Sequence, residues 1–205
     1  ENIAGFTRAV GDGVREELLQ DKYDKMALFI GVLEKIKNIP NLLRAGKLVL
    51  SAHSRTLLVL IGDGPERERL EKLCSTLGIG DHVRFMGVIP YDAIPSYLAA
   101  CDVFVLPSWS EGFPRVLLEA TFVAKPIVVT DVNGAGDIVT DGESGYIVPL
   151  DDSEKLAEKI AGLLGNPEKA QEMGRRGYEN TLRYRDFDGN VKELVNLWQG
   201  MVAGK

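Results

Sequence analysis

Short apolar runs rich in β-branched residues alternate along most of this chain with longer segments of helical periodicity. The strand candidates are residues 27–32, 56–61, 82–86, 103–106, 126–130 and 145–148, and the helical segments between them are 41–52, 66–77, 93–100, 115–124 and 137–140. Strands that are apolar on both faces and separated by helices predict a parallel sheet covered on two sides. Right-handed crossovers then give an α/β fold with a Rossmann-like, doubly wound sheet.

The pattern divides the chain into parts. Residues 1–25 are polar, and we expect an irregular tail or interdomain linker with a short helix near residues 14–19. Residues 26–185 carry the strand–helix alternation and form the predicted domain, which is long enough to enclose a substantial core.

The last quarter of the chain shows only helical patterns. Residues 151–153 are expected to cap one helix, Pro167 to begin a second, and residues 186–205 to form a C-terminal helix. Asp186 and Asp188 have a spacing that can hold a divalent metal, but no strand precedes them, so helix capping by Asp188 is the favoured interpretation.

Composition excludes several classes of function. The net charge is −6 and no basic run is present, which argues against nucleic-acid binding. No stretch approaches the ~20 apolar residues of a membrane span, although a peripheral membrane acceptor remains open. The two cysteines are too few for a disulfide framework and favour a reducing cytoplasm, and neither has a neighbour spaced for metal.

One nine-residue segment follows a predicted strand and begins a predicted helix: Glu111-Gly112-Phe113-Pro114-Arg115-Val116-Leu117-Leu118-Glu119. Pro114 suits the first helical turn, and the N–H groups of the next three residues have no partner within the helix. These groups add the partial positive charge of the helix start and predict a phosphate site.

The two glutamates of this segment have separate candidate roles. Glu119 lies on a helix that is apolar nearly all round, where a carboxylate needs hydrogen-bond donors such as the hydroxyls of a ribose. Glu111 lies in the loop and can face a sugar ring beyond the phosphates. The structural alternative is that Glu119 pairs with a buried Lys or Arg while Glu111 caps a helix.

Two glycines in another loop have an open role. Gly62 and Gly64 follow a strand and precede a helix, so their backbone can approach a ligand, and a tight turn explains them equally well.

The spacing of Glu111 and Glu119 resembles the E-x7-E pattern of retaining glycosyltransferases with the GT-B fold, of the family-four or group 1 type. Residues 82–87, 100–108, 126–131 and 141–148 resemble further motifs of that family in the same order. The resemblance implies the C-terminal, nucleotide-sugar-binding domain. The acceptor domain, which supplies a histidine near the reacting carbon, would be missing, since His53 and His82 match no catalytic histidine and are expected to be structural.

The resemblance also implies roles for single residues. Glu111 would contact donor-sugar hydroxyls and Glu119 the ribose, while the backbone from Phe113 and Pro114 to Arg115 and Val116 would hold the diphosphate.

Two further loops enter through the same resemblance. Lys37 would also grip the diphosphate and, with Glu111, is a candidate catalytic residue, but Val32 stands where the family has an arginine. Gly87 and Ile89 would lie against the nucleobase.

The intact protein is therefore expected to move a sugar from a nucleoside diphosphate sugar to an acceptor hydroxyl with retention, without metal or cofactor, and this chain alone to bind without turnover. The alternatives are a non-catalytic nucleotide-sugar-binding module and a sugar-nucleotide epimerase of GT-B architecture. The base, sugar, acceptor and oligomeric state leave no signature in the sequence.

Overall fold

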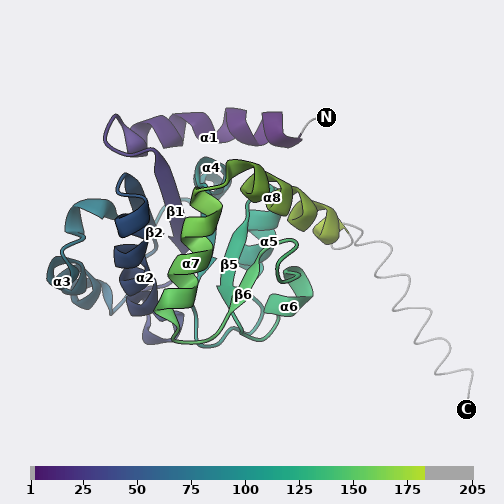
Figure 1. Ribbon diagram of the computed structural model, residues 1–205. Helices are drawn as coiled ribbons and strands as arrows, with labels where there is room; N and C mark the ends of the chain where they lie inside the picture. The colour runs from purple at the N-terminus through teal and green to yellow at the C-terminus, as the bar shows by residue number, and fades with distance from the viewer. Residues whose placement is uncertain (1–2, 183–205) are drawn as a thin grey trace, which may run out of the picture.

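A computed structural model describes residues 3–182 of the chain. Its centre is a parallel six-stranded sheet of order β3-β2-β1-β4-β5-β6 (Figure 1). The strands are β1 (Lys25–Ile30), β2 (Thr56–Ile61), β3 (Val83–Gly87), β4 (Val103–Leu106), β5 (Ile127–Thr130) and β6 (Tyr146–Val148). The order reverses between β1 and β4, which is the switch point where such sheets open a crevice at their carboxyl edge. The predicted fold class is confirmed.

Helices cover both faces of this sheet, with α2 and α7 in front of it in Figure 1 and α4 and α5 behind. The helices are α1 (Ile3–Leu19), α2 (Ile39–Ala52), α3 (Arg67–Leu77), α4 (Ile94–Ala100), α5 (Arg115–Phe122), α6 (Ala135–Ile138), α7 (Ser153–Leu164) and α8 (Pro167–Thr181). Single 3₁₀ turns lie at Lys35–Lys37, Gly80–His82 and Tyr91–Ala93. No helix in the described range is long and apolar enough to cross a membrane.

The core lies along the central strands. Every residue of β2, β4 and β5 is buried, and Phe29 of β1 and Phe104 of β4 are among the largest fully buried side chains. This two-sided burial is why these strands are continuous apolar runs in the sequence. The predicted strands lie within two residues of the observed ones. The largest difference is β1, which begins two residues earlier because Lys25 and Met26 already pair with β2.

The segment before β1 differs most from its prediction. Helix α1 is far longer than residues 14–19 and packs against α4, with Leu18 and Leu19 buried. At Gly11 the two helices approach so closely that a Cβ would lie 2.6 Å from the carbonyl carbon of Ala99. The expectation of an irregular tail is wrong for the described part of residues 1–25, because apolar positions on α1 complete the core. That residues 1–25 link two domains stays a prediction.

The helices after β6 begin as predicted. The Asp152 carboxylate accepts the Lys155 amide at the start of α7, and Asn166 caps α8 with Pro167 in its first turn. The predicted helix at residues 186–205, with Asp186 and Asp188, lies outside the described residues.

Loops at the carboxyl edge are joined backbone to backbone. Gly31 N donates to Ile61 O at 2.9 Å, and Gly62 N donates to Gly87 O at 2.8 Å. Gly62 has φ +126°, and a Cβ there would lie 2.0 Å from Gly31 O. Only glycine allows this approach, which fixes the loops after β1, β2 and β3 to one another.

A second connection, the Asp151 clasp, consists of Asp151, Asn38 and Trp109. Asp151 Oδ1 accepts hydrogen bonds from Asn38 Nδ2 at 3.0 Å and Trp109 Nε1 at 2.7 Å. Asn38 and Asp151 both have left-handed backbones, with φ of 47° and 58°. Such conformations persist where surrounding contacts over-determine them. The clasp joins the loops after β1, β4 and β6.

Two glycine-to-alanine changes test helix packing with opposite expected signs. Gly162 on α7 faces open space, so Gly162→Ala should raise the free energy of unfolding by roughly 0.5–1 kcal/mol. Gly174 on α8 is buried, with a Cβ position 2.0 Å from Ala124 O, so Gly174→Ala should lower it by about 2 kcal/mol or more. Urea unfolding measures both, and equal effects would contradict the close contact of α8 with this segment.

The clasp predicts a local effect of Asp151→Gly. Two hydrogen bonds worth about 1 kcal/mol each are lost while left-handed strain of similar size is relieved, so global stability should change little. Amide exchange at Trp109, whose N–H donates to Ile36 O at 2.8 Å, should accelerate. Hydrogen exchange followed by mass spectrometry checks this.

The matched control for that experiment is Asp152→Ala. It removes the adjacent carboxylate and should instead accelerate exchange at the start of α7, where Lys155 N is its partner. The same exchange pattern in both variants would contradict a clasp centred on Asp151.

Candidate functional site

Loops after β1, β3 and β4 converge at the carboxyl edge. Lys37 follows β1, Tyr91 follows β3, and Glu111 follows β4. Lys37 Nζ lies 2.8 and 2.9 Å from the two carboxylate oxygens of Glu111, and Tyr91 Oη lies 2.9 Å from Glu119 Oε1. The structure therefore brings the two candidate catalytic residues together, with Glu119 on the helix that follows.

Glu111 is held almost out of solvent, with its side chain 11% exposed and that of Lys37 21% exposed. Ser108 Oγ also donates to Glu111 Oε1, at 2.5 Å, and the carbonyl of the buried Ser108 accepts Thr130 Oγ1 from β5. Three neighbouring segments thus fix one carboxylate. A buried ion pair adds little net stability, because the loss of hydration offsets the attraction between the charges. The main effect of this pair is therefore to hold the two side chains in fixed positions.

Neither structural alternative for the glutamates is found among the described residues. Helix α5 has no side-chain cap, so Glu111 does not cap it. Glu119 accepts a hydroxyl, that of Tyr91, rather than an ion pair from Lys or Arg. That hydrogen bond raises the pKa of the Tyr91 phenol, because it favours the protonated form beside a carboxylate.

The start of α5 corrects the prediction that three amides lack partners. Pro114 lies just before the helix with φ −79° and ψ 74°, an inverse γ-turn, rather than in its first turn. As a result Arg115 N donates to Phe113 O and Leu117 N to Pro114 O, both at 2.9 Å. Of the three amides, only that of Val116 has no acceptor within the described residues.

The loop after β3 carries the residues predicted for the nucleobase. Gly87 has φ +69° and pairs with Gly62, while Ile89 is half-buried against the core. Val88 between them is 81% exposed and is the side chain that this loop presents to solvent.

Gly64 in the loop after β2 is explained by packing. A Cβ there would lie 2.6 Å from Leu33 O. Close approach of the chain to itself therefore accounts for both Gly62 and Gly64, and contact with a ligand at these two residues stays a prediction.

The loops that form the site carry exposed apolar side chains, here called the apolar rim, and of its members only Phe113 was among the predicted donor-binding residues. Its members come from the loops after β1, β3 and β4 and are Val32, Ile36, Val88, Tyr91, Trp109 and Phe113, each more than a third exposed. Alternating patterns locate buried faces, and an apolar loop residue gives no such signal. Exposed apolar side chains that form a contiguous patch are typical of surfaces that contact another molecule or domain.

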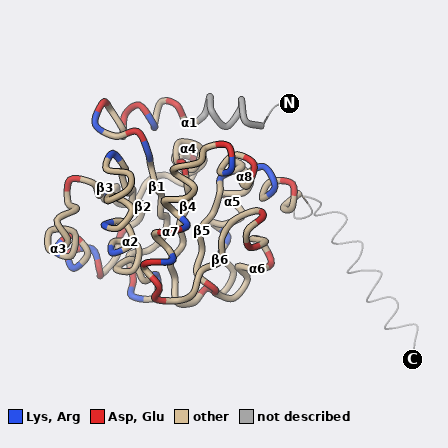
Figure 2. The backbone as a smooth tube through the Cα atoms, in the orientation of Figure 1, with Lys and Arg blue, Asp and Glu red and all other residues tan. Residues whose placement is uncertain are grey.

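Both histidines serve the scaffold, as predicted. A ring nitrogen of His53 lies 3.0 Å from Ala161 O, and one of His82 lies 3.1 Å from Thr56 O. Across residues 3–182 no three His, Cys, Asp or Glu side chains gather as a metal site. Figure 2 shows acidic and basic residues interspersed over the described chain.

Comparison with known proteins gives this site a context. The family model for glycosyl transferases group 1 matches residues 12–180. An uncharacterized glycosyltransferase of Methanocaldococcus jannaschii is 30% identical over 185 residues, covering 90% of this chain and 51% of that protein. The chain thus spans about half the length of this curated relative.

Solved structures agree on the fold. The C-terminal domain of a glycosyl transferase group 1 family protein from Francisella tularensis has a TM-score of 0.75 and 25% identity, covering 84% of this chain and 93% of that one. The Anabaena protein HepE, solved in complex with UDP, has a TM-score of 0.82 and 22% identity, covering 92% of this chain and 52% of that one. This chain belongs to the glycosyl transferases group 1 family and has the α/β fold of its C-terminal domain.

Proposed function

We propose that the chain is the donor-binding domain of a retaining glycosyltransferase, which moves a sugar from a nucleoside diphosphate sugar to an acceptor hydroxyl. The observation that carries this proposal is the contact of Lys37 with Glu111 just before α5, on which Glu119 lies. Each of the three suits a different part of one donor molecule.

The diphosphate is assigned to Lys37 and the start of α5. Departure of a nucleoside diphosphate develops negative charge, which is best stabilised by groups placed beforehand. The Lys37 ammonium is already fixed by Glu111, and the Val116 amide stands at the positive end of α5 without a protein acceptor among the described residues. These groups supply that charge in the proposal, which requires no metal or cofactor.

The ribose is assigned to Glu119. This carboxylate accepts a hydrogen bond from the Tyr91 hydroxyl, so an exposed hydroxyl donor already reaches it from the loop after β3. A ribose hydroxyl offers the same donor chemistry and would take the place of the phenol. Tyr91 is 77% exposed and has room to move aside.

The transferred sugar is assigned to Glu111. Its two oxygens accept from Lys37 and Ser108, and each carboxylate oxygen can take more than one donor. Sugar hydroxyls can therefore bind to Glu111 while Lys37 remains near the phosphates. Gly87 and Ile89 are assigned to the nucleobase, and the UDP bound to HepE supports a nucleoside diphosphate as the ligand class.

The acceptor and its domain are assigned to protein outside this chain. The chain covers 51% of its Methanocaldococcus relative, and the apolar rim faces outward around the site. We propose that a second domain closes over this rim and completes catalysis, so that the chain alone binds donor without turnover. Two free, buried cysteines suit the cytoplasmic location that we also propose.

A first prediction separates the two glutamates by ligand chemistry. Glu119→Ala should weaken binding of UDP by about tenfold and bring it close to that of 2′,3′-dideoxy-UDP, because only Glu119 is assigned to the ribose. Glu111→Ala should leave the preference for UDP over the dideoxy form intact. Calorimetry with both ligands measures this, and equal loss of the preference in both variants would overturn the assignment.

A second prediction concerns Val32, which is 49% exposed where the family resemblance expects arginine. Val32→Arg adds a cation at the phosphate end of the proposed site and should tighten UDP binding by roughly three- to tenfold, with a steeper salt dependence. Val88→Arg is the matched control, since it adds the same charge on the loop after β3. A tighter complex with the control alone would contradict the position assigned to the diphosphate.

A further inference from the structure

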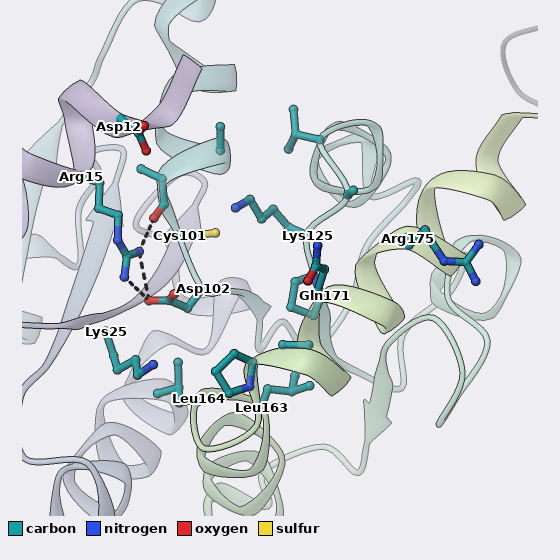
Figure 3. Close-up of a pocket in the computed structure, with 17 residues that line it drawn as sticks. Asp12, Arg15, Lys25, Cys101, Asp102, Lys125, Leu163, Leu164, Gln171 and Arg175 are labelled. Carbon is teal, nitrogen blue, oxygen red and sulfur yellow. Dashed lines mark hydrogen bonds and ion pairs between the residues drawn. The ribbon is translucent and has the colours of Figure 1, made fainter. Parts of the chain in front are cut away.

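A cavity lies at the amino edge of the sheet, opposite the candidate donor site. It has a volume of about 550 Å³ and is lined by Arg15, Lys25, Asp102, Lys125, Leu163 and Leu164, among others (Figure 3). Lys25 begins β1, Asp102 precedes β4, and Lys125 precedes β5, whereas the candidate donor site follows the strands. This amino-edge cavity is therefore separate from that site, and its volume lies within the range of small-molecule sites.

One ion pair in the cavity is fully used by the fold. Arg15 donates to Asp102 Oδ2 at 3.1 and 3.2 Å, to Ala100 O at 2.7 Å and to Asp24 O at 2.8 Å. The same Asp102 oxygen accepts the amide of Met26 at 2.7 Å. This network joins α1 to the C-terminal end of α4 and to the start of β1. Arg15 and Asp102 therefore have structural roles in the fold.

Lys125, in contrast, has no such structural partner among the described residues. Its side chain is partly buried, and this burial lowers its pKa because the charged form loses water. The adjacent Cys101 brings no counter-charge at neutral pH, since burial raises the pKa of that thiol to about 12. The Asp102 carboxylate raises the pKa of Lys125, whereas the Arg15 guanidinium lowers it. A desolvated ammonium without a partner is costly to a fold.

Lys25 is a second lysine that lines the cavity, and its side chain is partly buried. Figure 3 draws hydrogen bonds from Arg15 to its partners and none to Lys25 or Lys125, whose side chains extend from separate strand starts. Among the described residues, neither ammonium has a hydrogen-bond or ion-pair partner. Leu163 and Leu164 of α7 add an apolar wall.

We propose that the amino-edge cavity binds a small molecule with an acidic group, a carboxylate or a phosphate, through Lys125 and Lys25, with its carbon skeleton against Leu163 and Leu164. The flexible lysine ammonium is a point charge that accepts either kind of anion. The site is distinct from the proposed donor site and does not depend on it.

The test follows lysine side chains of the full chain by NMR with ¹³Cε-labelled lysine. Inorganic phosphate and citrate are the two probes, and Lys125→Met assigns the Lys125 resonance. We expect at least one probe to shift this resonance saturably and to raise the pKa of Lys125 toward the ordinary lysine value. A response to phosphate alone identifies a phosphorylated ligand, and a response to citrate alone identifies a carboxylic acid.

Variants separate this site from general anion binding. Lys25→Met should weaken probe affinity at Lys125 at least tenfold, while Lys47→Met, an exposed lysine of α2, should not change it. No shift at Lys125 with either probe, or an unchanged affinity in Lys25→Met, overturns the proposal.

Thermal unfolding supplies a check that does not require ligand. Lys125→Met should unfold at the same temperature as the parent chain or higher, because it removes a buried charge and keeps the side-chain volume. A clear fall relative to Lys47→Met would show that the ammonium has a structural partner, and the binding proposal would then be wrong.

Discussion

Parallel pairing of β1 with β4 is the constraint on which the candidate site depends. Ala27 and Leu28 pair with Val103 and Phe104, so the loops that leave the two strands emerge side by side. One loop carries Lys37 and the other Glu111, and their ion pair forms across the switch point of the sheet. A sheet with another order would separate these residues even if every strand were kept.

Much of the fold was predictable because the central strands are buried on both faces and therefore appear as continuous apolar runs. The starts of α7, capped within residues 151–153, and of α8, at Pro167, were predictable because local residues determine them. The full length of α1 was not, because its place depends on a close approach at Gly11 to a helix nearly ninety residues later in the chain. Long-range contacts of this kind have no local pattern.

The candidate site divides in the same way. Lys37 and Glu111, for which the family resemblance implied roles in one site, are in direct contact, whereas the role of the start of α5 in phosphate binding stays a prediction. The backbone of Pro114 was not foreseen, because a proline fixes φ and leaves ψ open, and ψ 74° turns the next amide back onto Phe113. The Asp151 clasp could not be predicted from the sequence either, because it joins three loops that are distant in sequence through Asn and Asp residues with left-handed backbones.

The hydrogen bond between Tyr91 and Glu119 engages the carboxylate that the proposed function assigns to the ribose. Under the proposed function an incoming ribose hydroxyl would displace the phenol, so the affinity for donor would reflect the exchange of one hydrogen-bond donor for another. The displaced phenol also loses the neighbour that raises its pKa, which makes its ultraviolet absorbance at alkaline pH a built-in optical gauge of occupancy.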